Sequence, residues 1–511
     1  MPNEEIKSPL PPRRFSTVVG EETTTTPPFP PEVDQPPAET VSPKPTENII
    51  SSQPTIVKKK SKLPLILGIV AGLVILLFLI FKVVIPKTGG GGSTGPVTIN
   101  YWGLWEDPVV IGGVIADYES KNPGVKINYV RNQITNYRSR LQTRLETDSS
   151  TSSGEAPDIF RIHESWMPMF KGDLAKVPAA TANSIGLDND YYQSYKNDIK
   201  AGGSWMAIPL MYDGLSLFYN KDLIDSAQVA LPKSWWDLGP AAKKLTVRDA
   251  NGKIIVAGAA LGLTDNIDHW SDILGLMLKQ GGVDILSTDP AESKKLQDTL
   301  TFYTLFKTQD RVWDETLPNS TQLFANGKLA FYFGPSWRVF NIEDMKVPNL
   351  KYGITTVPQL PTLSDPTAQS GNDANLTNIN WSSYWVEGVN PKSKNQAEAW
   401  KFLAFLSTKE NLEKLYTAEA QTRTFGEFYP RKSMAGSLST NDKVKPFLAG
   451  ADSAMGGYLS ANTSDGGLND TMIGYFGNAI NAIVFKNSTP EAVMPDLRNG
   501  INQLIQKYGL K

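Results

Sequence analysis

Residues 208–223 read Ile-Pro-Leu-Met-Tyr-Asp-Gly-Leu-Ser-Leu-Phe-Tyr-Asn-Lys-Asp-Leu. Pro209 and Gly214 interrupt the stretch, and a short apolar and aromatic run ends at Tyr219. This run is too short and too aromatic for a lone amphipathic helix, so it predicts a β-strand. A turn-prone segment precedes it and a helix start follows it. The pattern is typical of a strand that crosses from one half of a two-part domain to the other.

Length and composition limit the class of protein. The chain has 511 residues, enough for two or three domains of ordinary size. Its net charge is only -2, whereas a nucleic-acid surface needs a concentrated basic excess, so we expect no nucleic-acid partner. The absence of cysteine excludes disulfides, thiolate metal sites and a lipid-modified N-terminal cysteine. Two histidines, His163 and His269, cannot form a three-histidine zinc site, and we expect neither metal nor cofactor.

The composition of residues 1–62 predicts that they form a disordered cytoplasmic tail. They are rich in Pro and Thr and lack apolar clusters, so they cannot bury enough surface to offset their ordering entropy. Repeated Pro-Pro pairs favour extended polyproline conformations. Two roles remain open for such a tail: a solvated spacer, or a docking site for a proline-recognising partner.

Residues 63–85 predict one transmembrane helix. About 23 mainly apolar residues, each rising about 1.5 Å, span the hydrocarbon core. Four lysines directly precede the run, so the positive-inside rule places the N-terminus in the cytoplasm and the rest of the chain outside. A cleavable signal peptide fits poorly, because the apolar run is too long and begins too far into the chain. We therefore expect a single-pass protein of the cell membrane.

Two features accompany the predicted span. Gly68 and Gly72 form a Gly-x-x-x-Gly pair, which is either a weak homodimerisation face or the ordinary small-residue content of a membrane helix. Residues 86–96 are rich in glycine and predict a flexible tether that holds the next domain close to the membrane.

From residue 97 onward, strand and helix signals alternate. We predict strands at 97–102, 125–130 and 156–160, with helices at 109–120 and 136–147 between them. This order implies an α/β fold with a mostly parallel sheet, in which ligands collect at the carboxyl ends of the strands. Further along, we predict strands near 329–333 and 351–358, helices at 395–406, 470–486 and 492–508, and helix caps at Ser234 with Asp237 and at Ser407 with Glu410.

Several short motifs then occur in a characteristic order. With them, the chain resembles the family 1 extracellular solute-binding proteins of ABC importers, the group that includes maltose-binding protein. The match covers roughly 97–510 and rests on Asn122-Pro123-Gly124-Val125, Ala156-Pro157-Asp158-Ile159-Phe160, Gly172-Asp173-Leu174, Ile208-Pro209, Tyr219-Asn220-Lys221-Asp222-Leu223, Pro232-Lys233-Ser234-Trp235, Asn326-Gly327-Lys328-Leu329-Ala330, Tyr352-Gly353-Ile354 and Ala399-Trp400-Lys401-Phe402-Leu403. Each motif is weak alone, and the ordered set is specific.

The resemblance implies a two-lobed periplasmic-binding-protein-like fold of type II with a ligand cleft between the lobes. It places lobe 1 at about 97–209 and 361–420, and lobe 2 at about 210–360 and 421–511. The chain then crosses between lobes at about 208–213, near 357–362, and again near Gln421. Hinge closure on the ligand and delivery to ABC permease subunits follow from the same resemblance.

A sugar cleft needs aromatic planes for the C–H faces of the rings and polar groups for their hydroxyls. The family often places a stacking tryptophan near Trp337 and a polar contact near Arg431. It also often has a Gly-Gly-rich segment where this chain has residues 380–383. We expect the ligand to be held by Trp105, Glu106, Asp107, Arg161, His163, Glu164, Trp166, Tyr212, Asp213, Trp270, Trp337, Trp381, Tyr384, Arg431 and Tyr475.

Core packing is the alternative role of each aromatic residue. Trp105, Trp166, Trp270 and Trp337 fall in predicted loops and are assigned to the cleft, whereas Trp102 and Trp385 remain open between the two. Helical patterning assigns four tryptophans to the core: Trp235, Trp236, Trp313 and Trp400.

Three functions are compatible with these features. The first is a membrane-anchored receptor that delivers a di- or oligosaccharide to an ABC importer. The second is a sugar-binding sensory or adhesive ectodomain, which the long tail keeps open. The third is a glycosidase with a carboxylate pair. The chain lacks a Gly-x-Ser-x-Gly motif, a phosphate loop and a His-Glu-x-x-His motif, so we do not expect the protein to be an enzyme.

Overall fold

A computed structural model describes residues 97–146, 156–361 and 376–510. The expected tail, membrane span, glycine pair and tether all lie outside these ranges. Among the helices of the described ranges, none has both the length and the apolar sequence that crossing a bilayer requires.

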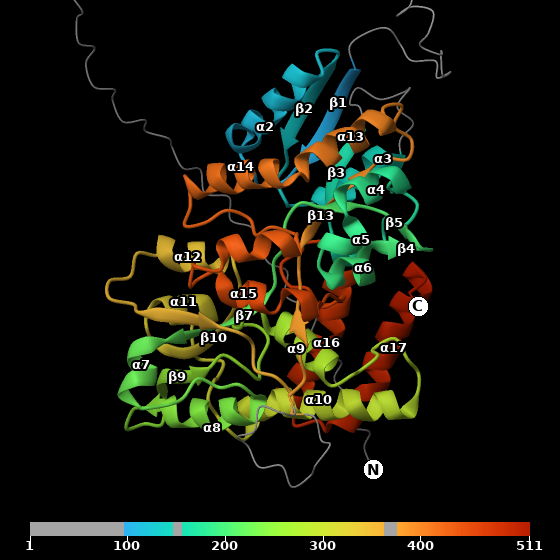
Figure 1. Ribbon diagram of the computed structural model, residues 1–511. Helices are drawn as coiled ribbons and strands as arrows, with labels where there is room; N and C mark the ends of the chain where they lie inside the picture. Colours follow the sequence, from blue (N-terminus) through green and yellow to red (C-terminus); the bar gives the residue numbers. More distant parts are fainter. Residues whose placement is uncertain (1–96, 147–155, 362–375, 511) are drawn as a thin grey trace, which may run out of the picture. The chain divides into compact units, whose positions relative to one another are not determined.

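The first sheet contains the predicted β-α-β-α-β unit (Figure 1). Its strand order is β2-β1-β3-β13-β6, and β1 pairs in parallel with both β2 and β3, as predicted. Strand β13 joins it antiparallel to β3 and β6. The strands are β1 (Val97–Gly103), β2 (Val125–Arg131), β3 (Ile159–His163), β6 (Ile208–Pro209) and β13 (Trp385–Val389).

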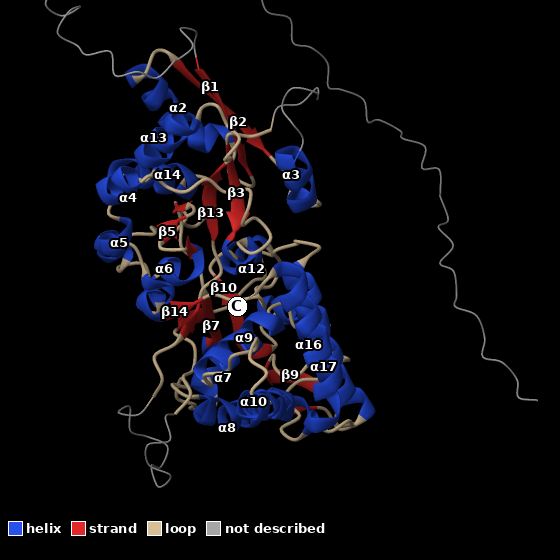
Figure 2. Cartoon of the chain, turned by 90° about the vertical axis from the view of Figure 1, so that its right-hand side faces the viewer, coloured by secondary structure: helices blue, strands red, loops and turns tan. Residues whose placement is uncertain are grey.

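Helices pack on both faces of this sheet. Figure 2 shows α2, α13 and α14 on one side of the strands and α3 on the other. The helices of this part are α2 (Pro108–Lys121), α3 (Tyr137–Glu146), η1 (Glu164–Trp166), α4 (Ala179–Ile185), α5 (Leu187–Asp190), α6 (Gln193–Ile199), α13 (Gln396–Leu406) and α14 (Lys409–Ala420), with a small hairpin of β4 (Lys200–Ala201) and β5 (Ser204–Trp205).

The second sheet has the order β11-β7-β10-β9-β8. Its strands are β7 (Leu215–Asn220), β8 (Val247–Arg248), β9 (Ile254–Ala259), β10 (Leu329–Pro335) and β11 (Tyr352–Thr355). Every residue of β10 is buried, as expected for a central strand. The helices of this part are α7 (Lys221–Ser226), α8 (Trp235–Leu245), α9 (Trp270–Gln280), α10 (Pro290–Thr308), α11 (Ser320–Ala325), α12 (Arg338–Asp344), η3 (Lys432–Leu438), α15 (Lys445–Ala449), η4 (Ala451–Ser453), α16 (Leu468–Lys486) and α17 (Pro490–Tyr508).

The stretch 208–223 connects the two sheets, as its sequence predicts. Ile208 and Pro209 pair with β13 in the first sheet, and Leu215 to Asn220 form β7 in the second. The connection between them is short and buried. The polypeptide therefore passes from one sheet to the other within residues 210–214.

The second connection differs from the expectation near 357–362. Gln359 still exchanges backbone hydrogen bonds with Lys233 and Trp235 of the second part. The Gln280 side-chain amide donates to both Pro358 O and Ile379 O, at 3.0 Å each. The chain next pairs as β12 (Asn380–Trp381) with β14 (Ala454–Met455) and enters the first sheet only at β13. These two hydrogen bonds hold Pro358 and Ile379 to the end of α9.

The helix caps were predicted with mixed success. The box at α8 is confirmed: Ser234 Oγ accepts from Asp237 N at 3.2 Å, and Asp237 Oδ2 accepts from Ser234 N at 3.0 Å. The cap of α14 was predicted one residue too early. Thr408 Oγ1 accepts from Asn411 N, whereas Ser407 ends α13 and donates to Ala404 O.

Glycine allows a close approach of α8 to β9. A Cβ at Gly258 would lie 1.9 Å from Ala242 O, whereas a Cβ at Gly113, on the exposed face of α2, would meet nothing within 4 Å. We predict that Gly258→Ala lowers the free energy of unfolding by about 1–3 kcal/mol through overpacking. Gly113→Ala should raise it by up to about 1 kcal/mol, because alanine is the better helix former. Denaturant unfolding measures both, and equal effects would contradict the packing argument.

Candidate functional site

A cavity of about 910 Å³ opens where the two sheets and their connections meet. Loops that follow β1 and β3 supply one wall, and the turn from β10 into α12 supplies another. The connecting segments at 211–213 and 383–385 and the end of α14 complete it. This is the edge where the carboxyl ends of the parallel strands lie, as the sequence predicted. We call it the main cavity.

Asp213 lies in this cavity at the crossing and binds three segments of the chain. Its Oδ1 accepts from Gly214 N at 2.7 Å and from Ser336 N at 3.1 Å. Its backbone oxygen accepts from Ser383 N, on the second connection, at 3.1 Å. Burial raises the pKa of Asp213 to about 8, against the lowering effect of the two backbone donors. Asp213 is therefore both a residue that lines the main cavity and a junction of three chain segments.

Arg161 lies below the cavity wall and positions Glu106. Its guanidinium forms ion pairs with Glu106, after β1, and with Glu387 of β13. The Nε–H donates to Glu387 Oε1 at 2.7 Å, and Tyr101 Oη donates to the same oxygen at 2.8 Å. Arg161 is nearly fully buried, so it holds Glu106 in place without reaching the cavity itself. Burial raises the pKa of Glu387.

Trp105 and Trp385 form an aromatic wall on the first-sheet side. Their rings meet edge to face with centroids 5.0 Å apart. Trp166 packs behind Trp385, with ring centroids 5.1 Å apart, and is fully buried. It supports the wall and does not face the cavity, contrary to the expectation. His163 also contacts Trp385 at 5.1 Å. Burial lowers the pKa of His163 to about 3, so its imidazole is neutral, and its two nitrogens contact Ser165 Oγ at 2.6 Å and Ser383 Oγ at 3.0 Å.

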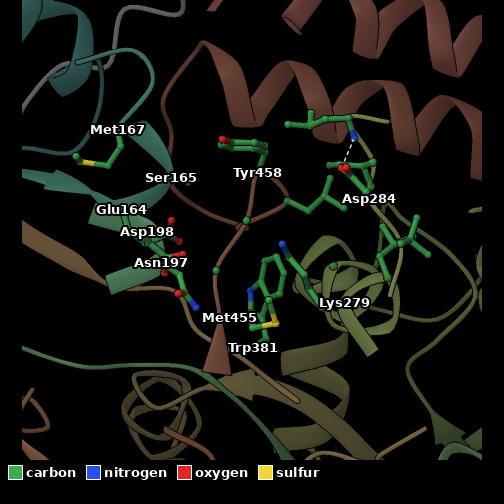
Figure 3. Close-up of a pocket in the computed structure, with 18 of the residues that line it drawn as sticks. Glu164, Ser165, Met167, Asn197, Asp198, Lys279, Asp284, Trp381, Met455 and Tyr458 are labelled. Atoms are coloured by element: carbon green, nitrogen blue, oxygen red, sulfur yellow. Dashed lines mark hydrogen bonds between the residues drawn. The ribbon is translucent and has the colours of Figure 1, made fainter. Parts of the chain in front are cut away.

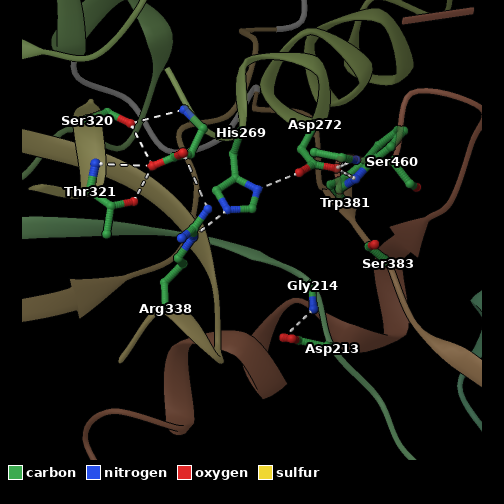
Figure 4. Close-up of polar contacts among 12 residues, drawn as sticks. Asp213, Gly214, His269, Asp272, Ser320, Thr321, Arg338, Trp381, Ser383 and Ser460 are labelled. Carbon is green, nitrogen blue, oxygen red and sulfur yellow. Dashed lines mark hydrogen bonds and ion pairs between the residues drawn. The ribbon is translucent and has the colours of Figure 1, made fainter. Parts of the chain in front are cut away.

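Trp337 lines the cavity from the second-sheet side. The residue after it, Arg338, belongs to a polar chain with His269 and Asp272 (Figure 4). The Arg338 guanidinium lies 4.3 Å from the Trp337 ring centroid, and Arg338 Nε donates to His269 Nε2 at 2.9 Å. His269 Nδ1 donates to Asp272 Oδ2 at 2.8 Å. Burial lowers the pKa of His269, consistent with a neutral ring that accepts at one nitrogen and donates at the other.

The end of α14 contributes charged groups that sequence analysis missed. Arg423 pairs with Glu419 at 2.8 Å and with Glu427 at 2.9 Å. Burial raises the pKa of Glu419 to about 8, with Glu427 as the next cause. The Arg423 guanidinium lies 4.9 Å from the Phe340 ring centroid. The Glu-x-x-x-Arg-x-x-x-Glu spacing in the sequence is a signal that could have identified this cluster.

The structure brings part of the expected site together. Six expected residues line the main cavity: Trp105, Glu106, Asp107, His163, Asp213 and Trp337. Arg161, Trp166 and Tyr212 are buried behind or beside it. Among residues not expected there, Trp385, Ser336, Ser383, Met211 and the α14 cluster line it. Trp385 was left open because strand alternation alone does not say which face meets a cavity.

Other expected residues lie elsewhere. Trp270 begins α9 and lies against Gly477 of α16. Arg431 forms an ion pair with Asp190 at 2.9 Å and does not line the main cavity. Tyr475 Oη donates to Gln503 on α17.

The remaining three belong to a second cavity. Glu164 and Trp381 line this separate cavity of about 560 Å³ (Figure 3), and Tyr384 Oη donates to Asp198 at its edge. The two cavities have no lining residue in common.

The core assignments are mostly confirmed. Trp235, Trp313 and Trp400 are buried. The assignment of Trp236 was wrong, because it lies on the outer face of α8, 47% exposed, and stacks on Phe302. Within the described ranges, no group of three or more His, Cys, Asp or Glu residues is placed to hold a metal ion.

Comparison with known proteins identifies the family. The family description of bacterial extracellular solute-binding proteins matches residues 108–413, more than half of the chain. The chain belongs to this family. This confirms the resemblance on which the sequence analysis relied.

Among its relatives, a putative binding protein of Brucella abortus is 25% identical over 57% of this chain and 67% of its own length. A maltooligosaccharide ABC transporter solute-binding lipoprotein of Streptococcus pneumoniae is 24% identical over 50% of this chain and 62% of its own.

Solved structures show the same fold. A cyclo/maltodextrin-binding protein complexed with maltotetraose superimposes with a TM-score of 0.63, at 16% identity, over 82% of this chain and 99% of its own. The sugar-binding protein MalE of Xanthomonas citri gives a TM-score of 0.64 at 18% identity, over 80% and 98%. The expected two-lobed, periplasmic-binding-protein-like α/β fold is therefore confirmed.

The buried Asp213 carboxyl predicts a pH dependence of stability. Its pKa is about 8 in the folded state against an ordinary value of 3.8, so between these pH values the folded chain binds a proton that the unfolded chain has lost. Its contribution to stability is therefore complete below about pH 4 and is lost as the pH rises towards 8. Asp213→Asn keeps an acceptor for both backbone donors. We predict that between pH 5 and pH 8 the melting temperature of this variant falls less than that of the wild type. Parallel melting curves would contradict this.

Proposed function

We propose that this protein is a membrane-anchored extracellular solute receptor that captures a di- or oligosaccharide in the main cavity and delivers it to an ABC importer. The observation that carries the proposal is the pairing of aromatic planes and acceptors across the cavity. Trp105 and Trp385 face it from one lobe, and Trp337 faces it from the other. Glu106 and Asp213 add carboxyl groups that can bind hydroxyls. The volume, about 910 Å³, suits a ligand of several sugar rings.

Hinge closure is supported by the position of the connections. The crossing at 211–213, the second connection at 383–385 and the segment after α14 all line the main cavity. A ligand that contacts these segments also contacts both lobes. Its binding energy would therefore favour the closed arrangement over the open one, which is the difference that a transport partner can sense.

The proposed ligand class agrees with the relatives. The Streptococcus pneumoniae lipoprotein is described as a maltooligosaccharide transporter component, and the cyclo/maltodextrin-binding protein was solved with maltotetraose. Neither residue pattern nor cavity suggests turnover of the ligand: we propose a binding protein rather than an enzyme. Permease subunits are the partners that this function requires.

Maltotetraose binding tests the ligand assignment. We predict that Trp385→Ala weakens the binding of maltotetraose to the full-length protein by about tenfold or more, because a stacking plane is lost. Isothermal titration calorimetry measures the dissociation constant. Trp236→Ala is the matched control, since Trp236 is exposed on α8 and lies outside the main cavity.

Two outcomes would overturn the assignment. One is the absence of binding by any sugar in a panel of maltotetraose, maltose and mannotriose. The other is equal weakening by the two tryptophan variants when both remain folded.

The membrane orientation can be tested because the chain contains no cysteine. Ser51→Cys places a single thiol before the predicted span, and Thr94→Cys places one after it. We predict that a membrane-impermeant maleimide labels Thr94→Cys on intact cells and labels Ser51→Cys only after the cells are opened. Labelling of both or neither variant on intact cells would contradict the single-pass orientation.

A further inference from the structure

The second cavity lies between parts of the two lobes and is separate from the main one. One side is formed by η1 and α6 of the first lobe, and the other by the end of α9 and the loop that follows it (Figure 3). The loop 455–459 closes the cavity, while the next residues, 461–463, line the main cavity. With about 560 Å³, it has room for a small organic molecule.

Two carboxyl groups face the second cavity from the first lobe. Glu164 is only 3% exposed, and its Oε1 accepts from Ser460 Oγ at 3.3 Å. Within the described part of the chain, no group donates to its Oε2. Asp198 lies beside it and accepts from Tyr384 Oη at 2.8 Å. A Cβ at Gly456 would lie 2.9 Å from Asp198 Oδ2 and 3.2 Å from Glu164 Oε1, so the two carboxyls meet around one point that a side chain would fill.

Burial disfavours the ionised form of both carboxyls. Burial raises the pKa of Glu164, with repulsion from Asp198 as the next cause. Burial also raises the pKa of Asp198, to about 6. Lys279 and the Ser460 hydrogen bond act in the opposite direction on Glu164 without restoring its usual pKa. A cation placed between the two carboxyls would relieve the cost of burying them.

On the second-lobe side the cavity is lined by one lysine, Lys279, and by Asp284, whose Oδ1 already accepts from Leu286 N at 2.9 Å. Lys279, in the last turn of α9, lies across the cavity from Glu164 and Asp198 (Figure 3). In the residues that the structure describes, its ammonium has neither a hydrogen-bond acceptor nor an ion-pair partner. The wall between the opposite charges is apolar and includes Leu278, Val283, Ile285, Leu286 and Trp381.

We propose that the second cavity binds a small zwitterion of the amino-acid or dipeptide class. Its ammonium group lies between Glu164 and Asp198, its carboxylate pairs with Lys279, and its side chain packs on Leu278 and Val283. Opposite charges at opposite ends of an apolar cavity match this class of ligand. A simple amine would leave Lys279 unpaired, and a neutral sugar would bring no charge to Glu164, Asp198 or Lys279.

Calorimetry on the full-length protein tests the proposal with four probes built on the leucine side chain, of which the dipeptide carries two such chains and the others one. They are L-leucine, L-leucyl-L-leucine, 3-methylbutylamine and 4-methylpentanoate. We expect one of the two zwitterions to bind, and each single-charge analogue to bind at least about tenfold more weakly because one ion pair is lost. Tighter binding of leucine than of the dipeptide would identify a free amino acid as the ligand, and the reverse would identify a dipeptide.

The variant Lys279→Met keeps the apolar stem and removes the charge. It should weaken zwitterion binding by at least about tenfold and leave 3-methylbutylamine binding and maltotetraose binding unchanged. Lys294→Met is the matched control, since Lys294 is exposed on α10 and outside both cavities. It should change none of the three affinities.

Three outcomes would overturn the proposal. The amine could bind as tightly as the zwitterions, which would make this a cation site. Maltotetraose binding could fall in Lys279→Met, which would make the second cavity part of the sugar site. Binding by none of the four probes, in a protein that still binds maltotetraose, would also refute the proposal and would leave the proposed sugar function intact.

Discussion

The hydrogen bonds of Asp213 are the constraint on which the rest of the site depends. One residue binds the first crossing through Gly214 N, the second connection through Ser383 N, and the turn that carries Trp337 through Ser336 N. Short segments join the two lobes and also line the main cavity. The shape of the cavity therefore depends on the positions of these segments relative to one another. Burying a carboxyl disfavours its charged form, which raises the pKa of Asp213 to about 8. Functional sites often contain groups with shifted pKa values.

The order of elements was predictable because it is encoded locally. Apolar spacing, the Ser234–Asp237 capping box and the Gly-interrupted stretch at 208–223 each act within a few residues, and the structure confirms them. The position of the second crossing was not predictable in the same way. It depends on the Gln280 amide, which lies far along the sequence from Pro358 and Ile379 and holds both to the second lobe. A single sequence carries no signal for such a long-range contact.

The candidate site also contains residues that the local sequence predicts and residues that only long-range contacts place. Residues that directly follow a strand, such as Trp105, Glu106 and His163, were found because parallel strands end at one edge of a sheet. The roles of Trp166 and Trp385 were not separable in advance. They pack against each other, one fully buried and one lining the cavity, and both follow or lie in strands with apolar neighbours. The cluster around Arg423 was missed because its place at the cavity depends on the path that the chain takes after α14.

The two cavities are separated by a polar partition that centres on Asp272. Its Oδ2 accepts from His269, which steadies Arg338 and, through it, Trp337 of the main cavity. Its Oδ1 accepts from Trp381 Nε1, on the second cavity, at 2.9 Å, and from Ala461 N, on the main cavity, at 3.0 Å. One carboxylate therefore orients an aromatic wall on each side.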